Sequence, residues 1–339
     1  MTATRTVPSS LGRARRLVHP ALRVAVDRLS GDVRKLSEFH LGWADVDGNP
    51  IEADTGKGVR PALALLSAEA AGAEGRVAVP GAVAVELVHN FSLIHDDVID
   101  QDASRRHRTT VWAAFGVGPA IIAGDGLACL ATEVLLDPAV ENGAAAALLL
   151  CRGTTAMIAG QADDMAFESR ADVSVEECLA MAGRKTGALL ACASSIGSVL
   201  AGASPEVVAR LEGYGMHLGL SFQAVDDILG IWGDPGVTGK PAWSDLRQRK
   251  KTLPVAAALG SEGRAARRLA DMLAGGPLTE TEVEKAAALV DEAGGRRVTK
   301  DLATHHLNVA LDRLDHPGIA HGAAEELAGM ARFVVERDF

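Results

Sequence analysis

The chain is poor in aromatic side chains and lacks the cysteine patterns that build disulfide frameworks or metal sites. Phe, Trp and Tyr make up 4% of its 339 residues although 48% are apolar, so the apolar fraction is mostly Ala, Leu and Val. Small aliphatic residues of this kind favour closely packed helices over a strand-rich fold. The cysteines contain no Cys-x-x-Cys pair, and their apolar neighbours predict free core thiols in a reducing compartment. They are Cys129, Cys151, Cys178 and Cys192.

Other absences narrow the location and the partners of the protein. The net charge of −10 argues against a nucleic-acid surface. The N-terminus is Arg-rich and has no apolar stretch before a cleavage site, which argues against a signal peptide. Residues 186–205 carry no charge, but their serines and glycines fit a buried helix better than a membrane span. We therefore expect a cytoplasmic protein without a transmembrane segment.

Helical periodicity dominates the rest of the chain. We expect residues 1–15 to be disordered and residues 16–339 to form a single all-α domain, because the chain shows no alternating strand, no fixed-period repeat and no long linker. Apolar residues recur at helical spacing across 20–42, where the first helix is predicted. Further helices are predicted at 60–71, 79–103, 109–114, 119–136, 140–168, 174–202, 205–233, 250–259, 263–275, 278–293, 295–314 and 320–337.

The first candidate site lies in the sequence HNFSLIHDDVIDQDASRRHR. Asp96 and Asp100 are four residues apart and project from one face of a helix, with His89 on nearly the same stripe. Arg105 and Arg106 follow. Hard oxygen ligands beside guanidinium groups suit a magnesium-bound diphosphate better than a protein partner. Taken alone, an acidic pair on a helix is more often a solvated face.

A second acidic pair, Asp226 and Asp227, ends an otherwise apolar helix. A carboxylate there is costly without a cation, unless the helix end is simply exposed to water. The Gly- and Pro-containing stretch that follows, 233–254, is cationic. It is either a solvated surface or a loop that closes over a diphosphate. Its basic residues are Lys240, Arg247, Arg249, Lys250 and Lys251.

Three further groups are weaker signals. Lys185 enters a helix without another charge until Glu206, so its ammonium must reach solvent or meet an anion. Gln161 and Asp164 are ordinary helix surface, or they orient a cation or a water beside it. Lys57 and Arg60 flank a glycine in GKGVRP and can converge on a phosphate. His89 either donates to that anion or is a satisfied core residue.

Together these motifs resemble those of the trans-isoprenyl diphosphate synthases, the polyprenyl synthetase family that includes farnesyl and geranylgeranyl diphosphate synthases. GKGVRP, HNFSLIHDDVIDxxxxRR, GQADD, RKTG, FQAVDD and GK…SDLRQRKKTLP occur in the family's order between about residues 55 and 255. The resemblance implies one large helical bundle around a deep central cavity, the isoprenoid synthase type I fold. It also implies a homodimer.

The resemblance assigns roles position by position. It implies magnesium ligands at Asp96, Asp100 and Asp226, supported by Asp97 and Asp227. Positions that hold the allylic diphosphate are Arg105, Lys185, Thr186, Gln223, Lys240 and Lys250. Positions that hold isopentenyl diphosphate are Lys57, Arg60, His89 and Arg106.

One position departs from the family pattern. The second aspartate motif of many members ends with a third Asp four residues after the first, and this chain has Gly230 there. Glycine has no side chain to bind a metal. Asp234, four residues further on, is a candidate for helping through a water molecule.

The implied reaction joins isopentenyl diphosphate to an allylic diphosphate with three magnesium ions and no protein nucleophile. We expect Arg105, Lys185 and Lys240 to stabilise the departing diphosphate. Product length is expected to depend on Phe91 and Ser92, about one turn before Asp96, and geranylgeranyl diphosphate is preferred over farnesyl diphosphate.

Two other functions are compatible with part of the sequence. A class I terpene cyclase shares the Asp-rich motif and the helical fold, but the residues after Asp226 lack the Ser and Glu of its second metal motif. A cyclase also has no use for Lys57, Arg60 and His89. A catalytically silent subunit of a synthase is favoured only by Gly230.

Overall fold

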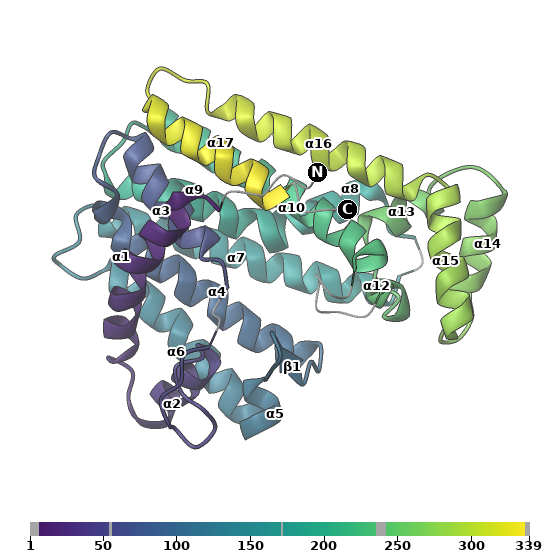
Figure 1. Cartoon of the computed structure of the whole chain (residues 1–339), viewed down its shortest axis with the longest axis horizontal. Helices are drawn as coiled ribbons and strands as arrows, with labels where there is room; N and C mark the ends of the chain where they lie inside the picture. The colour runs from purple at the N-terminus through teal and green to yellow at the C-terminus, as the bar shows by residue number, and fades with distance from the viewer. Residues whose placement is uncertain (1–6, 54–55, 171, 235–241, 336–339) are drawn as a thin grey trace. The chain divides into compact units, whose positions relative to one another are not determined.

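The computed structural model of the chain describes residues 7–53, 56–170, 172–234 and 242–335 (Figure 1). Helices dominate the described residues, so the all-α fold class is confirmed. The chain divides into two compact units. Unit 1 comprises residues 1–154, 192–212 and 315–330, and unit 2 comprises residues 155–191, 213–314 and 331–339. The single domain around a central cavity stays a prediction.

Unit 1 is built around α4, which packs against α3 and α6 (Figure 1). Small residues make these approaches possible. A Cβ atom at Gly124 of α6 would lie 2.2 Å from Nε2 of His95 on α4, and one at Gly81 would lie 2.9 Å from Leu200. Close packing of this kind is what the low aromatic content predicts. The elements are α1 (Ser9–Val26), α2 (Gly31–His40), α3 (Val59–Ala70), η1 (Gly75–Ala78), α4 (Val79–Ile99), α5 (Val111–Phe115) and α6 (Val117–Leu135), with parts of α7 (Gly143–Glu168), α9 (Ala188–Leu200), α10 (Pro205–Trp232) and α17 (His321–Val335).

The N-terminal segment corrects one prediction. Helix α1 begins at Ser9, so residues 9–15 are helical and not disordered as predicted. Leu11 and Ala14 are buried, and Nη2 of Arg13 lies 2.8 Å from Oε2 of Glu69 on α3. The apolar face was hard to read because arginines surround these two residues in the sequence.

The predicted helix over 20–42 is two helices, α1 and α2. Helix α1 ends at Val26, and α2 begins at Gly31, whose φ of +50° does not occur inside a helix. The apolar spacing continues through the break, because both helices bury one face. Periodicity alone therefore did not reveal it.

A short hairpin corrects the expectation that the chain has no strand. Strand β1 (Ser104–Arg105) pairs with β2 (Arg108–Thr109), and the turn residues Arg106 and His107 have φ of +51° and +62°. Two left-handed residues in a row are typical of a tight hairpin turn, although neither is glycine. Strands of two residues are too short to show alternation.

Unit 2 has its own apolar core. Ile231 at the end of α10 and Leu246 on α12 are buried there with residues of α13, α14 and α15. Its elements are α8 (Val175–Ala182), the π-helical turn η2 (Gly183–Gly187), α12 (Ser244–Arg247), α13 (Leu253–Leu259), α14 (Arg264–Ala274), α15 (Glu280–Glu292) and α16 (Gly295–Arg313), with the remaining parts of α7, α9, α10 and α17. The predicted helix over 174–202 therefore contains a π-helical turn, and α12 was not predicted.

The cysteines and the apolar helices qualify two further expectations. Cys178 and Cys192 are buried free thiols as predicted, but Cys129 and Cys151 are exposed, because they lie on outer faces of α6 and α7. By length and composition alone, three helices could cross a membrane: Gly75–Ile99, Val117–Leu135 and Gly143–Glu168. None of them is the uncharged 186–205 stretch.

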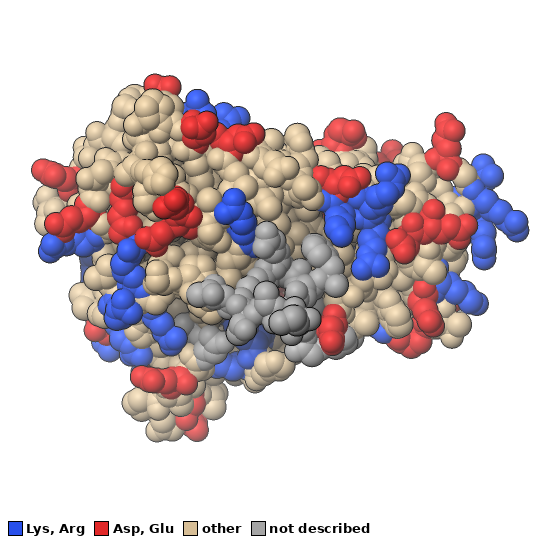
Figure 2. Space-filling view, turned by 45° about the horizontal axis from the view of Figure 1, so that its top comes forward, with Lys and Arg blue, Asp and Glu red and all other residues tan. Residues whose placement is uncertain are grey.

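On the face drawn in Figure 2, acidic and basic side chains are interspersed.

Candidate active site

The first aspartate motif lies at the C-terminal end of α4. Asp96 is in the last turn, and Asp100 is the residue directly after the helix, where its backbone N–H donates to Asp96 O at 2.8 Å. The last turn holds no basic residue. Because the C-terminal end of a helix carries partial negative charge, adjacent carboxylates there repel it and each other. A bound cation would relieve that repulsion.

Asp97 has a different environment from Asp96 and Asp100. Its side chain is only 2% exposed, and Nε of Arg105 donates to its Oδ1 at 2.8 Å. Burial raises the pKa of Asp97 to about 6, against the opposing effect of Arg105. Asp97 therefore holds Arg105 in place, while Asp96 is half-exposed and Asp100 exposed.

The hairpin brings Arg106 to the glycine-rich turn before α3. A Cβ atom at Gly56 would lie 2.9 to 3.1 Å from the guanidinium atoms of Arg106, so the missing side chain makes room for that group. Gly56 also has φ of +99°, which side chains disfavour. Lys57 follows directly. The structure thus brings the Lys57 turn and Arg106 together, and their role in holding isopentenyl diphosphate stays a prediction.

Arg60 and His89 are also brought together. Nη1 of Arg60 lies 3.2 Å from Nε2 of His89, and Arg60 can only donate. Burial, followed by Arg60, places the pKa of His89 well below its ordinary value, so the ring is neutral. Nε2 then accepts from Arg60, which leaves the proton on Nδ1. Glu86, one turn earlier, is half-buried near Arg60 and Arg106, and burial raises its pKa.

A small pocket of about 40 Å³ adjoins these groups in unit 1. His40, Asn90, Asp97, Arg105 and Arg106 are among its lining residues. Nε2 of His40 lies 3.1 Å from Oδ1 of Asn90, and burial, followed by Arg105, lowers the pKa of His40 to about 3. The neutral histidine thus adds no positive charge beside the arginines. Such a volume accommodates water rather than a substrate.

The second aspartate motif, in unit 2, shows the same division of roles as the first. Asp227 is buried, and its two oxygens accept from Nε2 of Gln223 at 2.8 Å and from the backbone N–H of Leu253 at 2.9 Å. Burial raises its pKa to about 7. Thr186 donates to Oε1 of Gln223 at 2.8 Å. Asp227 therefore ties the start of α13 to α10 and to η2, while Asp226 beside it is half-exposed.

Lys185 and Thr186 are positioned by the π-helical turn η2. Two glycines let neighbouring helices approach this turn: a Cβ atom at Gly160 of α7 would lie 2.2 Å from the backbone N of Lys185, and one at Gly219 of α10 would lie 2.5 Å from Cα of Gly187. Turns of this type often occur at functional sites because the extra residue redirects side chains. Local packing therefore fixes the backbone position from which the Lys185 side chain extends.

The ammonium of Lys185 meets an anion, one of the two outcomes predicted. Its Nζ donates to Oδ2 of Asp164 on α7. Gln161, one turn earlier, has a buried Oε1 for which the described part of the chain offers no hydrogen-bond partner. A buried oxygen in that state suits a cation or a water molecule.

The remaining predicted positions are less informative. Lys240 lies outside the described residues. Lys250 is half-buried three residues before α13. Phe91 is 8% exposed and stacks edge-on against His95 with 5.2 Å between ring centroids. Ser92 donates to His89 O at 2.8 Å.

The donor set fits magnesium. Among the described residues, no group of three or more His, Cys, Asp or Glu side chains could hold a metal alone. Magnesium keeps several waters and is usually held by one or two carboxylates together with substrate phosphates. Asp96, Asp100 and Asp226 are oxygen donors of that kind. The geometry of any bound ion stays a prediction.

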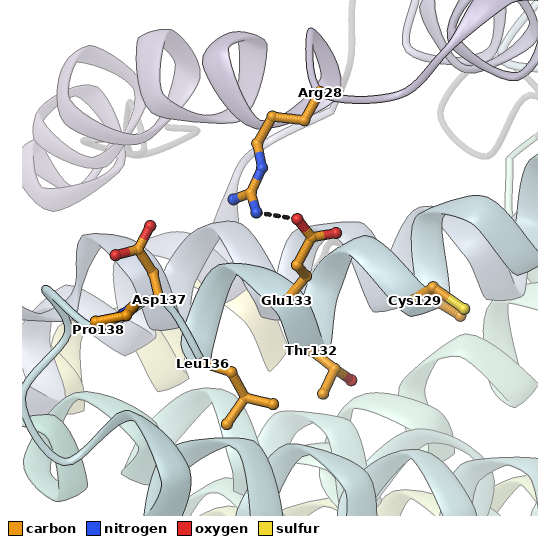
Figure 3. A pocket seen from close by; sticks show the side chains of 8 residues that line it. Arg28, Cys129, Thr132, Glu133, Leu136, Asp137 and Pro138 are labelled. Carbon is orange, nitrogen blue, oxygen red and sulfur yellow. Dashed lines mark hydrogen bonds and ion pairs between the residues drawn. The ribbon is translucent and has the colours of Figure 1, made fainter.

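A separate hollow of about 720 Å³ opens on unit 1 (Figure 3). Arg28 reaches across it to Glu133 on α6, and Cys129, Leu136 and Asp137 also line it. None of the residues predicted for diphosphate binding lines this hollow. It is therefore not part of the candidate site.

Several residues of the site were missed from the sequence. Glu86 and Asn90 share a helical face with His89, and that spacing was the available signal. His40 gave no such signal, because it lies on another helix, α2.

Comparisons with known proteins agree with these observations. Residues 49–290 match the family described as Polyprenyl synthetase. The chain is 48% identical to the (2E,6E)-farnesyl diphosphate synthase of Mycobacterium tuberculosis, covering 98% of this chain and 94% of that protein. It is 42% identical to the geranylgeranyl diphosphate synthase of the same species, covering 91% and 90%.

A solved structure agrees as well. The polyprenyl synthetase from Streptomyces coelicolor A3(2) is 52% identical with a TM-score of 0.93, covering 97% of this chain and all of that one. The chain therefore belongs to the polyprenyl synthetase family of trans-prenyltransferases.

Proposed function

We propose that the enzyme condenses isopentenyl diphosphate with an allylic diphosphate in a head-to-tail, 1′–4 coupling, and that its main product is geranylgeranyl diphosphate. One observation carries the proposal. Each aspartate motif has one buried carboxylate engaged in holding the structure, Asp97 or Asp227, beside a half-exposed one, Asp96 or Asp226. Family membership supports the use of both motifs on one diphosphate.

Asp96, Asp100 and Asp226 would hold magnesium through their carboxylates, with three ions in the proposal. The bound metal would supply positive charge that makes the allylic diphosphate a better leaving group. As the carbon–oxygen bond breaks, its electron pair passes to the diphosphate, and Arg105 stabilises the negative charge that accumulates there. Asp97 keeps that guanidinium aligned. Lys185 and Lys240 act with it, and Thr186, Gln223 and Lys250 contact the same diphosphate.

Isopentenyl diphosphate is held by Lys57, Arg60, His89 and Arg106 in this proposal. The neutral His89 ring offers its Nδ1 proton to a phosphate oxygen, because Nε2 accepts from Arg60. The double bond of isopentenyl diphosphate attacks the allylic carbocation and forms the new carbon–carbon bond. A proton then leaves to the released diphosphate. Orientation is the main contribution of these side chains.

Farnesyl diphosphate is the second candidate product, and the 48% identity to a farnesyl diphosphate synthase favours it. Phe91 supports a limited chain length, because it is a bulky buried side chain about one turn before Asp96. Mass analysis of the products from isopentenyl diphosphate with each allylic starter distinguishes the two.

The enzyme is proposed to be a cytoplasmic homodimer. The proposal of a cytoplasmic enzyme is supported by α4, which lies in one of the three segments long and apolar enough to cross a membrane but carries Glu86, His89 and the aspartate motif along its length. The homodimer is supported by family membership. Sedimentation of the purified chain tests it.

The activity is tested with the purified chain, magnesium and both substrates. Asp96→Ala combined with Asp226→Ala should abolish turnover, since each motif loses its half-exposed carboxylate. Asp32→Ala combined with Asp301→Ala is the matched control, because these carboxylates are 90% and 71% exposed on outer helical faces. Normal turnover by the first pair refutes the proposal.

The same assay distinguishes the two alternative functions, a class I terpene cyclase and a non-catalytic subunit of a synthase. A cyclised product from an allylic diphosphate alone would make the chain a terpene cyclase. No turnover by the wild-type chain, with turnover restored by a second subunit, would make it a non-catalytic subunit.

A further inference from the structure

The β1–β2 hairpin carries three arginines, and the proposed function uses only two of them. Arg105 and Arg106 are assigned to the two diphosphates. Arg108 lies directly opposite Arg105 in the register of the two strands. Because like charges at directly opposed strand positions repel each other, each of the two needs a partner elsewhere. Arg105 donates to Asp97, and Arg108 turns to a different element.

Arg108 caps the C-terminal end of α2. Its Nη2 donates to Phe39 O at 2.5 Å, and its Nη1 donates to His40 O at 3.3 Å. The guanidinium also lies over the ring of Phe39, 5.4 Å from its centroid. Carbonyl groups in the last turn of a helix lack helical donors and carry partial negative charge, so a guanidinium there is favourable. Its planar shape serves both carbonyls at once.

The backbone directly after α2 leaves room for this guanidinium. Gly42 has φ of +72°, and a Cβ atom there would lie 2.9 Å from Nη1 of Arg108 and 2.9 Å from Cβ of Ala53. Gly48, further along the same connector, has φ of +86°, but a Cβ atom there would meet nothing within 4 Å. The missing side chain at position 42 therefore serves the packing of Arg108 as well as the turn.

The hairpin, α2 and α4 are joined in pairs within unit 1. Arg108 joins the hairpin to α2, and the contact between Arg105 and Asp97 joins it to α4. At the end of α2, Nε2 of His40 lies 3.1 Å from Oδ1 of Asn90 on α4. Residues of all three elements line the pocket of about 40 Å³. Without the contact to α2, the hairpin would be free to tilt about its base at α4.

We propose that Arg108 is a positioning residue for both substrates: by capping α2, it orients the hairpin that presents Arg105 to the allylic diphosphate and Arg106 to isopentenyl diphosphate. The inference rests on the proposed function. The guanidinium of Arg108 is engaged with α2, so its effect passes through its two neighbours. A change at this one position should therefore alter the use of both substrates together.

Steady-state kinetics with the purified chain, magnesium and both substrates test this role. Arg108→Ala should lower kcat/KM for both substrates by about 10–100-fold, because a misplacement of about 1 Å can cost that much. Arg108→Lys should lie between Arg108→Ala and the wild type, because an ammonium is a point charge and cannot serve both carbonyls in the same geometry. Urea unfolding shows whether each variant is folded.

Arg34→Ala is the matched control. It removes an arginine from α2 itself, one that pairs with Asp27 and Glu38 at 2.8 and 2.9 Å and makes no printed contact with the hairpin. Both kcat/KM values should stay at the wild-type level.

Two glycine variants separate the position of Arg108 from its charge. Gly42→Ala keeps the charge but displaces the guanidinium, so it should also lower kcat/KM for both substrates. Gly48→Ala is its control, because it has a similar backbone cost without a contact and should behave as the wild type does. Added to Arg108→Ala, Gly42→Ala should have little further effect on kcat/KM, because the two changes act on the same contact.

Hydrogen exchange of residues 102–110, followed by mass spectrometry, measures the docking of the hairpin without substrate. Exchange should be faster in Arg108→Ala than in the wild type and unchanged in Arg34→Ala. The inference is overturned by wild-type kinetics in a folded Arg108→Ala, by an effect on only one substrate, or by wild-type kinetics in Gly42→Ala. Absence of turnover in the wild-type chain refutes the proposed function instead, and unchanged exchange in Arg108→Ala then refutes the docking role itself.

Discussion

The close approach of α7 to the π-helical turn predicts that Gly160→Ala damages both stability and substrate binding. The added Cβ atom would lie 2.2 Å from the backbone N and 2.7 Å from Cα of Lys185. Both are backbone atoms, which cannot rotate away as a side-chain end can. Helix α7 and the turn must therefore separate.

The magnitude follows from two opposing effects. Overpacking a closely packed interior costs about 1–3 kcal/mol. Alanine in place of glycine inside a helix returns about 0.5–1 kcal/mol. We expect a net loss of about 1–2 kcal/mol in the free energy of unfolding. Because the Lys185 side chain extends from these displaced backbone atoms, we also expect a higher KM for the allylic diphosphate.

Gly183→Ala is the matched control within the same turn. The nearest side-chain atoms to its added Cβ, on Leu220 and Met216, lie 3.7 and 3.8 Å away, which is ordinary contact. The control should be as stable as the wild type or slightly more so. Urea unfolding and steady-state kinetics measure both effects. A Gly160→Ala enzyme with unchanged stability and unchanged KM would show that this contact does not position Lys185.

Three further predictions concern unit 1. His40 has a pKa of about 3 when folded and 6.5 when unfolded, so the unfolded chain binds more protons below pH 6.5. The free energy of unfolding should therefore fall by up to about 1.4 kcal/mol for each unit by which the pH drops below 6.5. His40→Gln should flatten this dependence, measured by urea unfolding between pH 7 and 5, and an unchanged slope would contradict the prediction. Asp97→Ala removes the hydrogen-bond acceptor of Arg105, so it should lower the free energy of unfolding by about 1–3 kcal/mol and raise the KM for the allylic diphosphate. An unaltered KM would mean that the pair is structural only. Phe91→Ala opens space beside His95, so it should lengthen the product seen by mass spectrometry and lower the free energy of unfolding by about 3 kcal/mol. A product of the same length would exclude Phe91 as the residue that limits chain length.

Helical spacing predicted much of the site, because α-helices convert sequence distance directly into direction. Asp96 and Asp100 lie one turn apart at the end of α4 as expected. The uncharged stretch after Lys185 predicted that its ammonium must reach solvent or meet an anion, and the structure shows the second outcome, with Asp164 as the anion. The remaining helices were found where apolar periodicity placed them, within a few residues at each end.

Features that depend on tertiary contacts could not be predicted in the same way. The sequence does not show that Asp97 turns inward to Arg105, because the β1–β2 hairpin that presents Arg105 is too short to read. The carboxyl group of Asp245 on α12 fills the space beside Gly230 on α10, and no periodic pattern in the sequence relates the two positions. Helix α12 itself is a single turn stabilised by docking, so local sequence preference gave no signal.

The π-helical turn at Gly183–Gly187 makes the length of this segment as important as its composition. It contains one residue more than a regular helix would use over the same rise. Deleting a single residue there would permit an uninterrupted α-helix with α8 and α9 still in register, but Lys185 and Thr186 inside the turn would lose the positions that the extra residue gives them. Shortening the segment by one residue should therefore harm substrate binding more than most single replacements within it, even though the shortened segment can form a regular α-helix.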